Sequence, residues 1–304
     1  MAFLGYKDLF KQATDKASDP VYYTRIDAGS DATNYPISNA QKRQLGFKWR
    51  RYLSGTVMQF SVTSNNAIAA TDTQYMTQIV GILGHNLPDG TGIDALFDLR
   101  LSSSVLITYS INSSENGKFN SDYIYFRDYE SLVPYKVTIT ITVPGAYSGS
   151  YIDIGRVWVG PGWDLNNPNA DASNFNLMEG WKLGMTKGAN SKRTIGNQSF
   201  NNRTKALKTV DFKLRTYGDT ETIGAGLLGL DSTNCLLGFI DEMESGGECI
   251  IAPRDYMIAP SFSNQAKLWQ NRVTVYGESN ASSHEIKHIN GNNFEADFKI
   301  IEVI

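Results

Sequence analysis

The residues whose types and spacing most directly suggest chemistry are His284, Glu285 and His288, which match the HExxH pattern of zinc proteases. On a helix, two histidines four residues apart share one face and bind one Zn²⁺, with the glutamate beside them as general base. Ser282 and Glu285 can form a capping box, which favours a helix. However, Asn290-Gly291 follows at once and is the strongest short signal for a β-hairpin. On a strand the two imidazoles would lie about 13 Å apart, so we predict no metal site here.

A second chemical pattern, GxGxxG, runs from Gly224 to Gly229. A dinucleotide site needs this loop directly after a strand and at the start of a helix, so that the helix N-terminus meets the pyrophosphate. Here the polar segment 218–222 separates the glycines from the preceding strand, and 231–234 ends any helix after them. The pattern therefore indicates a glycine-rich turn, and we predict no cofactor.

Catalytic residues of other kinds do not stand out. His85 ends a strand, where a histidine ordinarily hydrogen-bonds the following turn, and a catalytic histidine would need a placed nucleophile and an orienting carboxylate. No acidic pair is distinguishable as a glycosidase site. We therefore predict that the chain is not an enzyme.

Cationic and aromatic residues interleave in one segment, a composition that can bind nucleic acid or anionic sugars. The alternative is a strand with the aromatic residues on one face and the charges on the other. The net charge of −3 argues against nucleic acid, so we expect an anionic patch on a partner protein as the better target. The cluster consists of Lys42, Arg43, Phe47, Lys48, Trp49, Arg50 and Arg51.

Tryptophan side chains stack on sugar rings and anchor protein interfaces. Strand alternation places Trp158 in the core. Trp163 and Trp181 fall in a loop-rich region, and we predict that these two contact a glycan or a neighbouring subunit, with local packing as the alternative.

The elements that position these residues are predicted to be β-strands. Residues 137–143 alternate apolar and hydroxyl side chains, the pattern of a strand with one buried face. Further strand-like segments, separated by turn-rich stretches and not by helices, predict a jelly-roll β-sandwich. The expected strands are 46–52, 56–62, 78–83, 95–101, 105–111, 122–126, 135–143 and 151–159.

The sequence divides into four parts within an all-β fold class. Residues 1–20 are an arm with a short helix over 4–16, and 21–163 are the jelly roll. The polar, Asn-rich segment 164–205 is a long connection. A second β-rich domain occupies 206–304, with strands expected at 210–217, 235–241, 248–252 and 272–276 and a closing pair around Asn290-Gly291.

The two cysteines, Cys235 and Cys249, lie in successive strand-like segments, which allows either a cross-strand disulfide or two buried thiols. No stretch approaches the ~20 apolar residues of a membrane span, so we predict no membrane insertion. Charges at Lys7, Asp8 and Lys11 interrupt any signal-peptide core. We expect the chain to be made in a reducing cytoplasm.

Several segments taken together resemble tail proteins of tailed-bacteriophage virions. They are Trp49-Arg50, the run Ile82-Leu83-Gly84-His85-Asn86-Leu87, the run IDIGRVWVG from Ile152 to Gly160 followed by Trp163, and the terminal Ile300-Ile301-Glu302. The resemblance covers most of residues 45–304. It implies a galactose-binding-like jelly roll in the first half of the chain.

The resemblance also implies a function. It points to a non-enzymatic tail-tip, baseplate or fibre-attachment component of the virion tail, present in several copies and assembled in the bacterial host cytoplasm. Its partners would be copies of itself and other tail proteins. The resemblance carries over no sugar site. The alternative function is a carbohydrate-binding module that recognises host surface glycans, which the jelly-roll pattern and the loop aromatics also suit.

Overall fold

The computed structural model describes residues 2–5, 8–64, 76–98, 105–110, 123–127, 136–165, 176–178, 180–186, 189–193, 199–203, 206–217, 235–253, 273–281, 283–291 and 293–303. These residues divide into two compact units. The first contains the described residues up to Asp164 together with Val273 and Thr274, and the second contains those from Leu165 to Pro253 and from Val275 onward. The GxGxxG segment lies outside the described residues. Each unit is treated by itself below.

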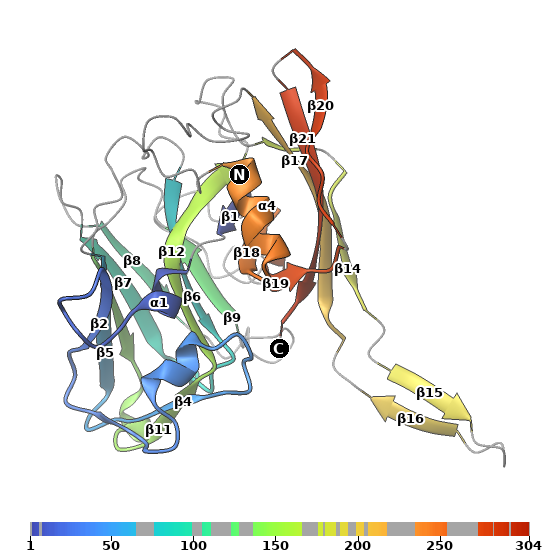
Figure 1. Ribbon diagram of the computed structural model, residues 1–304. Helices are drawn as coiled ribbons and strands as arrows, with labels where there is room; N and C mark the ends of the chain where they lie inside the picture. The colour runs from blue at the N-terminus through green and yellow to red at the C-terminus, as the bar shows by residue number, and fades with distance from the viewer. Residues whose placement is uncertain are drawn as a thin grey trace. The chain divides into compact units, whose positions relative to one another are not determined.

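The first unit is a β-sandwich, which confirms the predicted fold class (Figure 1). One sheet has the strand order β2-β5-β10-β7-β8, and the facing sheet has the order β1-β12-β6-β9. The bounds in the five-stranded sheet are Val21–Arg25 (β2), Val57–Ser64 (β5), Gly92–Asp98 (β7), Val105–Ser110 (β8) and Lys136–Thr142 (β10). Those in the facing sheet are Ala2–Gly5 (β1), Met76–Leu83 (β6), Tyr123–Arg127 (β9) and Arg156–Leu165 (β12).

Strand β10 shows why the alternating pattern produces this sandwich. It pairs antiparallel with β5 and β7, so that Ile139 lies between Phe60 and Ala95 in the register. All three side chains are fully buried. On the opposite face, Gln59 donates a hydrogen bond to Thr140 Oγ1 (2.9 Å). Apolar residues therefore line the core, and hydroxyl residues occupy the other face.

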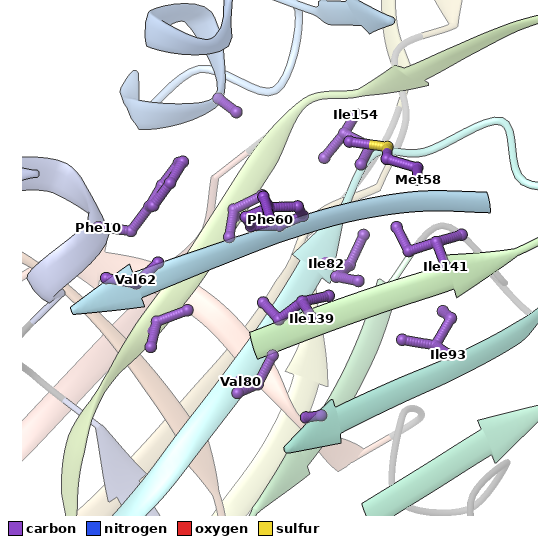
Figure 2. Packing of buried hydrophobic residues seen from close by; sticks show 14 of the residues in the cluster. Phe10, Met58, Phe60, Val62, Val80, Ile82, Ile93, Ile139, Ile141 and Ile154 are labelled. Atoms are coloured by element: carbon purple, nitrogen blue, oxygen red, sulfur yellow. The ribbon is translucent and has the colours of Figure 1, made fainter. Parts of the chain in front are cut away.

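Side chains from both sheets meet in one hydrophobic core (Figure 2). Phe60 packs against Trp49 edge-on, with ring centroids 5.3 Å apart, and against Phe10 at 6.1 Å. Val80 and Ile82 of β6 approach the same core from the facing sheet (Figure 2). Burial of these apolar surfaces is the dominant favourable term in folding such a domain.

The N-terminal segment differs from the prediction of one helix over 4–16. Leu4 belongs to strand β1, and α1 is a single turn, Leu9–Gln12. The helix begins where it does because the Asp8 carboxylate caps it, accepting a hydrogen bond from Phe10 N (2.9 Å). Phe10 is buried in the core, so this arm packs on its own domain.

A buried ion pair fastens this arm to β12. Arg156 Nη2 donates to Asp8 Oδ2 at 2.6 Å, and both side chains are almost completely inaccessible to solvent. Arg156 Nη1 donates to the carbonyl of Gln41. The other oxygen of Asp8 accepts from Val159 N (3.2 Å). The charges are thus hydrogen-bonded on several sides, as buried charges must be.

The predicted strand 151–159 is two strands that belong to different sheets. Strand β11 (Tyr151–Ile154) pairs with β4 (Trp49–Tyr52), whereas β12 begins at Arg156 and pairs with β6. Gly155 lies at the break and donates its N–H to Leu83 O (3.0 Å). A Cβ at Gly155 would stand 2.6 Å from Leu45 O, so the backbone approach there requires glycine.

Strands β11 and β4 form a small third sheet with β3, in the order β11-β4-β3. Strand β3 is Ser30–Asp31. Two 3₁₀ helices flank this sheet in the sequence, η1 (Ile37–Gln41) before β4 and η3 (Gly145–Tyr147) before β11.

The second unit is one antiparallel sheet with a helix. Its strand order is β13-β17-β21-β19-β18, with β14 also on β17 and β20 also on β21. The bounds are Asn176–Leu177 (β13), Lys182–Met185 (β14), Lys208–Tyr217 (β17), Leu236–Glu244 (α4), Glu248–Ala252 (β18), Val275–Ser279 (β19), Lys287–Asn290 (β20) and Asn293–Glu302 (β21). Phe212 and Phe298 stack across β17 and β21, 5.3 Å apart.

Helix α4 replaces the strand that the sequence predicts at 235–241, so that prediction is wrong. The buried side chains Leu236, Phe239, Ile240 and Met243 recur with helical spacing. Cys235 is the N-cap residue, and its Sγ accepts from Gly238 N at 3.3 Å. Both cysteines are free and buried, which confirms the two-thiol alternative.

Four strands lie in the described part of 164–205, where the sequence indicates an irregular connection. Besides β13 and β14, these are β15 (Ala189–Arg193) and β16 (Ser199–Arg203). Strands β15 and β16 pair antiparallel with each other and form a separate two-stranded sheet. Their Asn-, Ser- and Lys-rich sequences lack the apolar alternation that marks a half-buried strand, and this explains why the prediction missed them.

The hairpin predicted at Asn290-Gly291 is confirmed. Gly291 has a φ of +51°, and β20 pairs with β21 on either side of it. Of the HExxH residues, His284 and Glu285 lie in the irregular segment before β20 and His288 lies in β20, so none of them is on a helix. Among the side chains that the structure describes, no three histidine, cysteine, aspartate or glutamate groups stand close enough to bind a metal ion.

Gly277 in β19 yields a first testable prediction. A Cβ there would overlap the Ile301 carbonyl oxygen and stand 2.7 Å from Ile300 Cγ2. Gly277→Ala should therefore lower the free energy of unfolding by about 1–3 kcal/mol, measured by urea titration. Gly92→Ala is the matched control, because a Cβ on that β7 residue has nothing within 4 Å. Equal stability of the two variants would contradict the expected clash.

Candidate functional site

The small sheet β11-β4-β3 separates its side chains into a buried and an exposed face. Strand β4 alternates, with Trp49 and Arg51 buried and Tyr52 exposed. On β11, Ile152 is buried and Tyr151 is exposed. Period-two alternation on two adjacent strands thus gathers aromatic and polar side chains on the outward face.

On the buried face, Arg51 fixes β3 and the turn before it. Its guanidinium binds the carboxylates of Asp27 (2.9 Å) and Asp31 (2.7 Å) and the carbonyl of Gly29 (2.9 Å). Asp31 also accepts from Trp49 Nε1 (2.9 Å). Burial alone would raise the pKa of Asp27, but hydrogen bonds from Arg51 and from backbone N–H groups hold it below its ordinary value.

On the exposed face, three residues form one row across the sheet. Ser30, Tyr52 and Tyr151 are directly opposite one another in the register. The two tyrosine rings meet edge-on with centroids 5.4 Å apart, and they are 39% and 55% exposed. Beside them lies a pocket of about 390 Å³, lined by Ser30, Asp31, Ala32, Thr33, Tyr52 and Tyr151.

A bidentate ion pair lies next to the tyrosines. Arg50 donates from Nε and Nη2 to the two carboxylate oxygens of Asp153, at 2.7 and 2.8 Å. The guanidinium carbon lies 4.7 Å from the Tyr35 ring centroid and 5.9 Å from that of Tyr151. The hydrogen bonds to Asp153 raise the pKa of Arg50 above its ordinary value, so its charge is fixed.

This arrangement can bind a ligand that has both an apolar face and hydroxyl groups. The tyrosine rings offer apolar surface at low conformational cost. A guanidinium has five N–H donors, and Asp153 uses two of them. Each carboxylate oxygen of Asp153 retains a lone pair for a donor. Because the two charges cancel, the site suits a neutral ligand.

Two motifs that are far apart in the sequence meet beside this site. Asn86 donates its N–H to Asp153 O (3.1 Å), and Asp153 returns its N–H to Asn86 Oδ1 (2.8 Å). Asn86 belongs to the GHNL motif and Asp153 to the IDIGRVWVG motif. The first motif therefore fixes the strand that carries Asp153 and Tyr151.

Comparisons with known proteins give structural likeness but no family. No family model matches the chain, and no curated protein is significantly similar to it. One similar structure is a GH29 fucosidase from Ruminococcus gnavus, at 11% identity and a TM-score of 0.34, which covers 50% of this chain. This chain spans about a quarter (26%) of the length of that fucosidase.

Two more of the similar structures belong to other kinds of protein. A CBM32 module of a family 31 glycoside hydrolase from Clostridium perfringens is 15% identical, with 52% of this chain and 99% of that module covered and a TM-score of 0.31. The enzymatically active domain of tailspike protein 4 of bacteriophage CBA120 is 15% identical, with 46% and 19% covered and a TM-score of 0.27. Likeness at this level carries no conclusion on function.

The two predicted contact tryptophans have different environments. Trp163 is 1% exposed in β12, so the expectation that it faces a ligand is not met. It is buried because the strand continues to Leu165, beyond the end that the sequence predicts. Trp181 is partly exposed in the second unit and borders a pocket of about 230 Å³, together with Lys182, Asp211 and Lys213.

The basic cluster is largely committed to contacts inside the first unit. Arg50 and Arg51 are ion-paired, and Lys48 Nζ donates to Gly84 O at 2.5 Å. Lys42 lies over the exposed Phe47 ring, 4.4 Å from its centroid.

His85 Nδ1 accepts from Leu87 N (3.2 Å), as predicted for a structural histidine. No helix in the described ranges has the length and hydropathy needed to cross a bilayer.

The sequence reasoning missed Tyr52, Tyr151 and Asp153. The alternation in Trp49-Arg50-Arg51-Tyr52 assigns Tyr52 to the opposite face from Trp49, and this signal was present. The pairing of β11 with β4 was not predictable, because it depends on the break at Gly155.

Proposed function

We propose that this chain binds carbohydrate, and that it does so at the tyrosine pocket of the β11-β4-β3 sheet. The observation that carries the proposal is the exposed Tyr52–Tyr151 pair beside a pocket with hydroxyl groups and a charge-balanced Arg50–Asp153 pair. The C–H face of a pyranose packs on aromatic rings, and its hydroxyls donate and accept hydrogen bonds. The ligand is a neutral glycan, because the local charges are already paired.

A glycan array probed with the labelled chain tests this proposal. The best glycan is then titrated by calorimetry against the wild type and Tyr151→Ala. We expect the substitution to weaken binding at least tenfold, which is about 1.4 kcal/mol. Tyr147→Ala is the matched control, because Tyr147 is also exposed but does not line the pocket. Binding that survives Tyr151→Ala, or the absence of any bound glycan, contradicts the proposal.

A second candidate function is the tail component that the motif resemblance implies. It is supported by the β15–β16 ribbon, because an isolated two-stranded sheet is marginally stable in water and gains order from a partner. In this account the chain is a structural protein of a virion tail that assembles with copies of itself. Light scattering of the purified chain should then give a mass of several copies, and a strict monomer that is absent from purified virions would exclude it.

A further inference from the structure

Three polar side chains in the second unit form a hydrogen-bonded chain that the sequence did not reveal. Ser279 is the last residue of β19, Glu244 is the last residue of α4, and His284 lies in the segment before β20. Ser279 Oγ lies 3.0 Å from His284 Nε2. His284 Nδ1 lies 2.6 Å from Glu244 Oε1. These distances match the order nucleophile, base and orienting carboxylate.

The hydrogen-bond partners assign the histidine tautomer. An ionised carboxylate only accepts, so the proton lies on Nδ1 of His284. The hydrogen bond from His284 holds the pKa of Glu244 below its ordinary value, which keeps the carboxylate ionised. Nε2 is then an acceptor for the Ser279 hydroxyl. The Ser279 oxygen in turn accepts from Ala281 N (3.2 Å), which fixes its orientation.

The imidazole is held by more than this hydrogen-bonded chain. His284 N also donates to Glu244 Oε1 (2.8 Å), so one carboxylate oxygen fixes both the backbone and the ring. The ring packs on Phe298, with centroids 5.1 Å apart, and its side chain is 1% exposed. Ser279 is only partly buried. The base is thus shielded from water, while part of the surface of Ser279 stays exposed.

We propose that Ser279 is an activated nucleophile with His284 as its general base and Glu244 as a positioning residue, and that this site hydrolyses short-chain acyl esters. Ser279 Oγ forms a bond to the ester carbonyl carbon as its proton passes to His284 Nε2. The tetrahedral intermediate breaks the ester C–O bond, and the leaving alkoxide takes that proton. Water then attacks the acyl-serine with the same base, which releases the carboxylic acid and regenerates Ser279. This inference does not depend on the glycan proposal.

The test uses a fluorophosphonate probe, which reports serine nucleophilicity directly. We expect the wild-type protein to gain one covalent adduct, which peptide mass spectrometry places on Ser279, and to turn over p-nitrophenyl acetate. His284→Gln should lower the labelling rate by about 10²-fold or more. Glu244→Gln should lower it at least tenfold in a variant whose thermal unfolding remains cooperative. Ser283→Ala, which removes an exposed serine next to His284, should label as the wild type does.

Mapping on the unmodified protein avoids any uncertainty about folding of the variants. If the wild-type chain carries no adduct, or carries it on another residue, the proposal is overturned. A purely structural role for these residues predicts that outcome, because hydrogen bonds that only hold a turn do not make a serine react.

Discussion

Replacing Arg156 by methionine is expected to lower the free energy of unfolding by about 3–5 kcal/mol, measured by urea denaturation. In the wild type, Asp8 Oδ2 lies 2.6 Å from Arg156 Nη2. The substitution leaves the Asp8 carboxylate in the interior without this cation. It also removes the donor to Gln41 O. The N-terminal arm, which brings Phe10 into the core, should therefore detach first. Hydrogen exchange at Phe10 N, which Asp8 caps, should report this loss.

Arg25→Met is the control for this experiment. Arg25 also pairs with an aspartate, Asp31, at 2.8 Å, but its side chain is 42% exposed. Exposed pairs contribute about 0–1 kcal/mol, so the control should be nearly neutral. If Arg156→Met and Arg25→Met have similar stabilities, the Asp8–Arg156 pair does not fasten the arm.

The second large effect is expected at Arg51. Its side chain is 2% exposed between Asp27 and Asp31, so Arg51→Met leaves the Asp27 carboxylate without its cation and Asp31 with Arg25 alone. We expect a loss of about 3–5 kcal/mol in unfolding free energy. Glycan binding should fall as well, because the Arg51 network holds the Ser30–Asp31 wall of the pocket. Arg50→Met, on the same strand but the opposite face, should leave the stability nearly unchanged, because ion pairs of exposed side chains contribute little.

The loss of stability in Arg51→Met should depend on pH, and the lowered pKa of Asp27 fixes the direction of this dependence. Hydrogen bonds from Arg51 and from backbone N–H groups outweigh burial and lower the Asp27 pKa below 3.8 in the folded protein. A carboxyl with a depressed pKa contributes stability above its unfolded pKa and loses it as the pH falls through the folded value. The stability difference between wild type and Arg51→Met should therefore be full at pH 6 and shrink below about pH 4. A difference that stays constant down to pH 2 contradicts this.

Much of the first unit could be predicted because its strands have one buried face. Residues 137–143 alternate without interruption, and β10 lies there with the expected face inward. Trp158 is buried as the alternation indicates. In the second unit, the hairpin at Asn290-Gly291 was predictable because its turn needs a positive φ, which glycine adopts at low cost. These features depend on local sequence alone.

The features that the sequence did not predict depend on contacts between residues that are far apart in the chain. The apolar spacing of Leu4, Leu9, Phe10 and Ala13 indicates a helix, yet β1 places Leu4 in a sheet, so tertiary pairing overrides the local pattern. The break at Gly155 is set by the close approach of Leu45, more than a hundred residues earlier. The Ser279–His284–Glu244 arrangement joins a strand end, a loop and a helix end. No spacing rule in the sequence connects those three positions.

A crystal structure of the chain with its best neutral oligosaccharide tests the central claim most directly. Our account predicts one pyranose ring packed on Tyr52 or Tyr151, with at least one hydroxyl hydrogen-bonded to Arg50 or Asp153. A sugar bound at saturating concentration anywhere else, with these tyrosines left facing solvent, would show that the β11-β4-β3 pocket is not the recognition site.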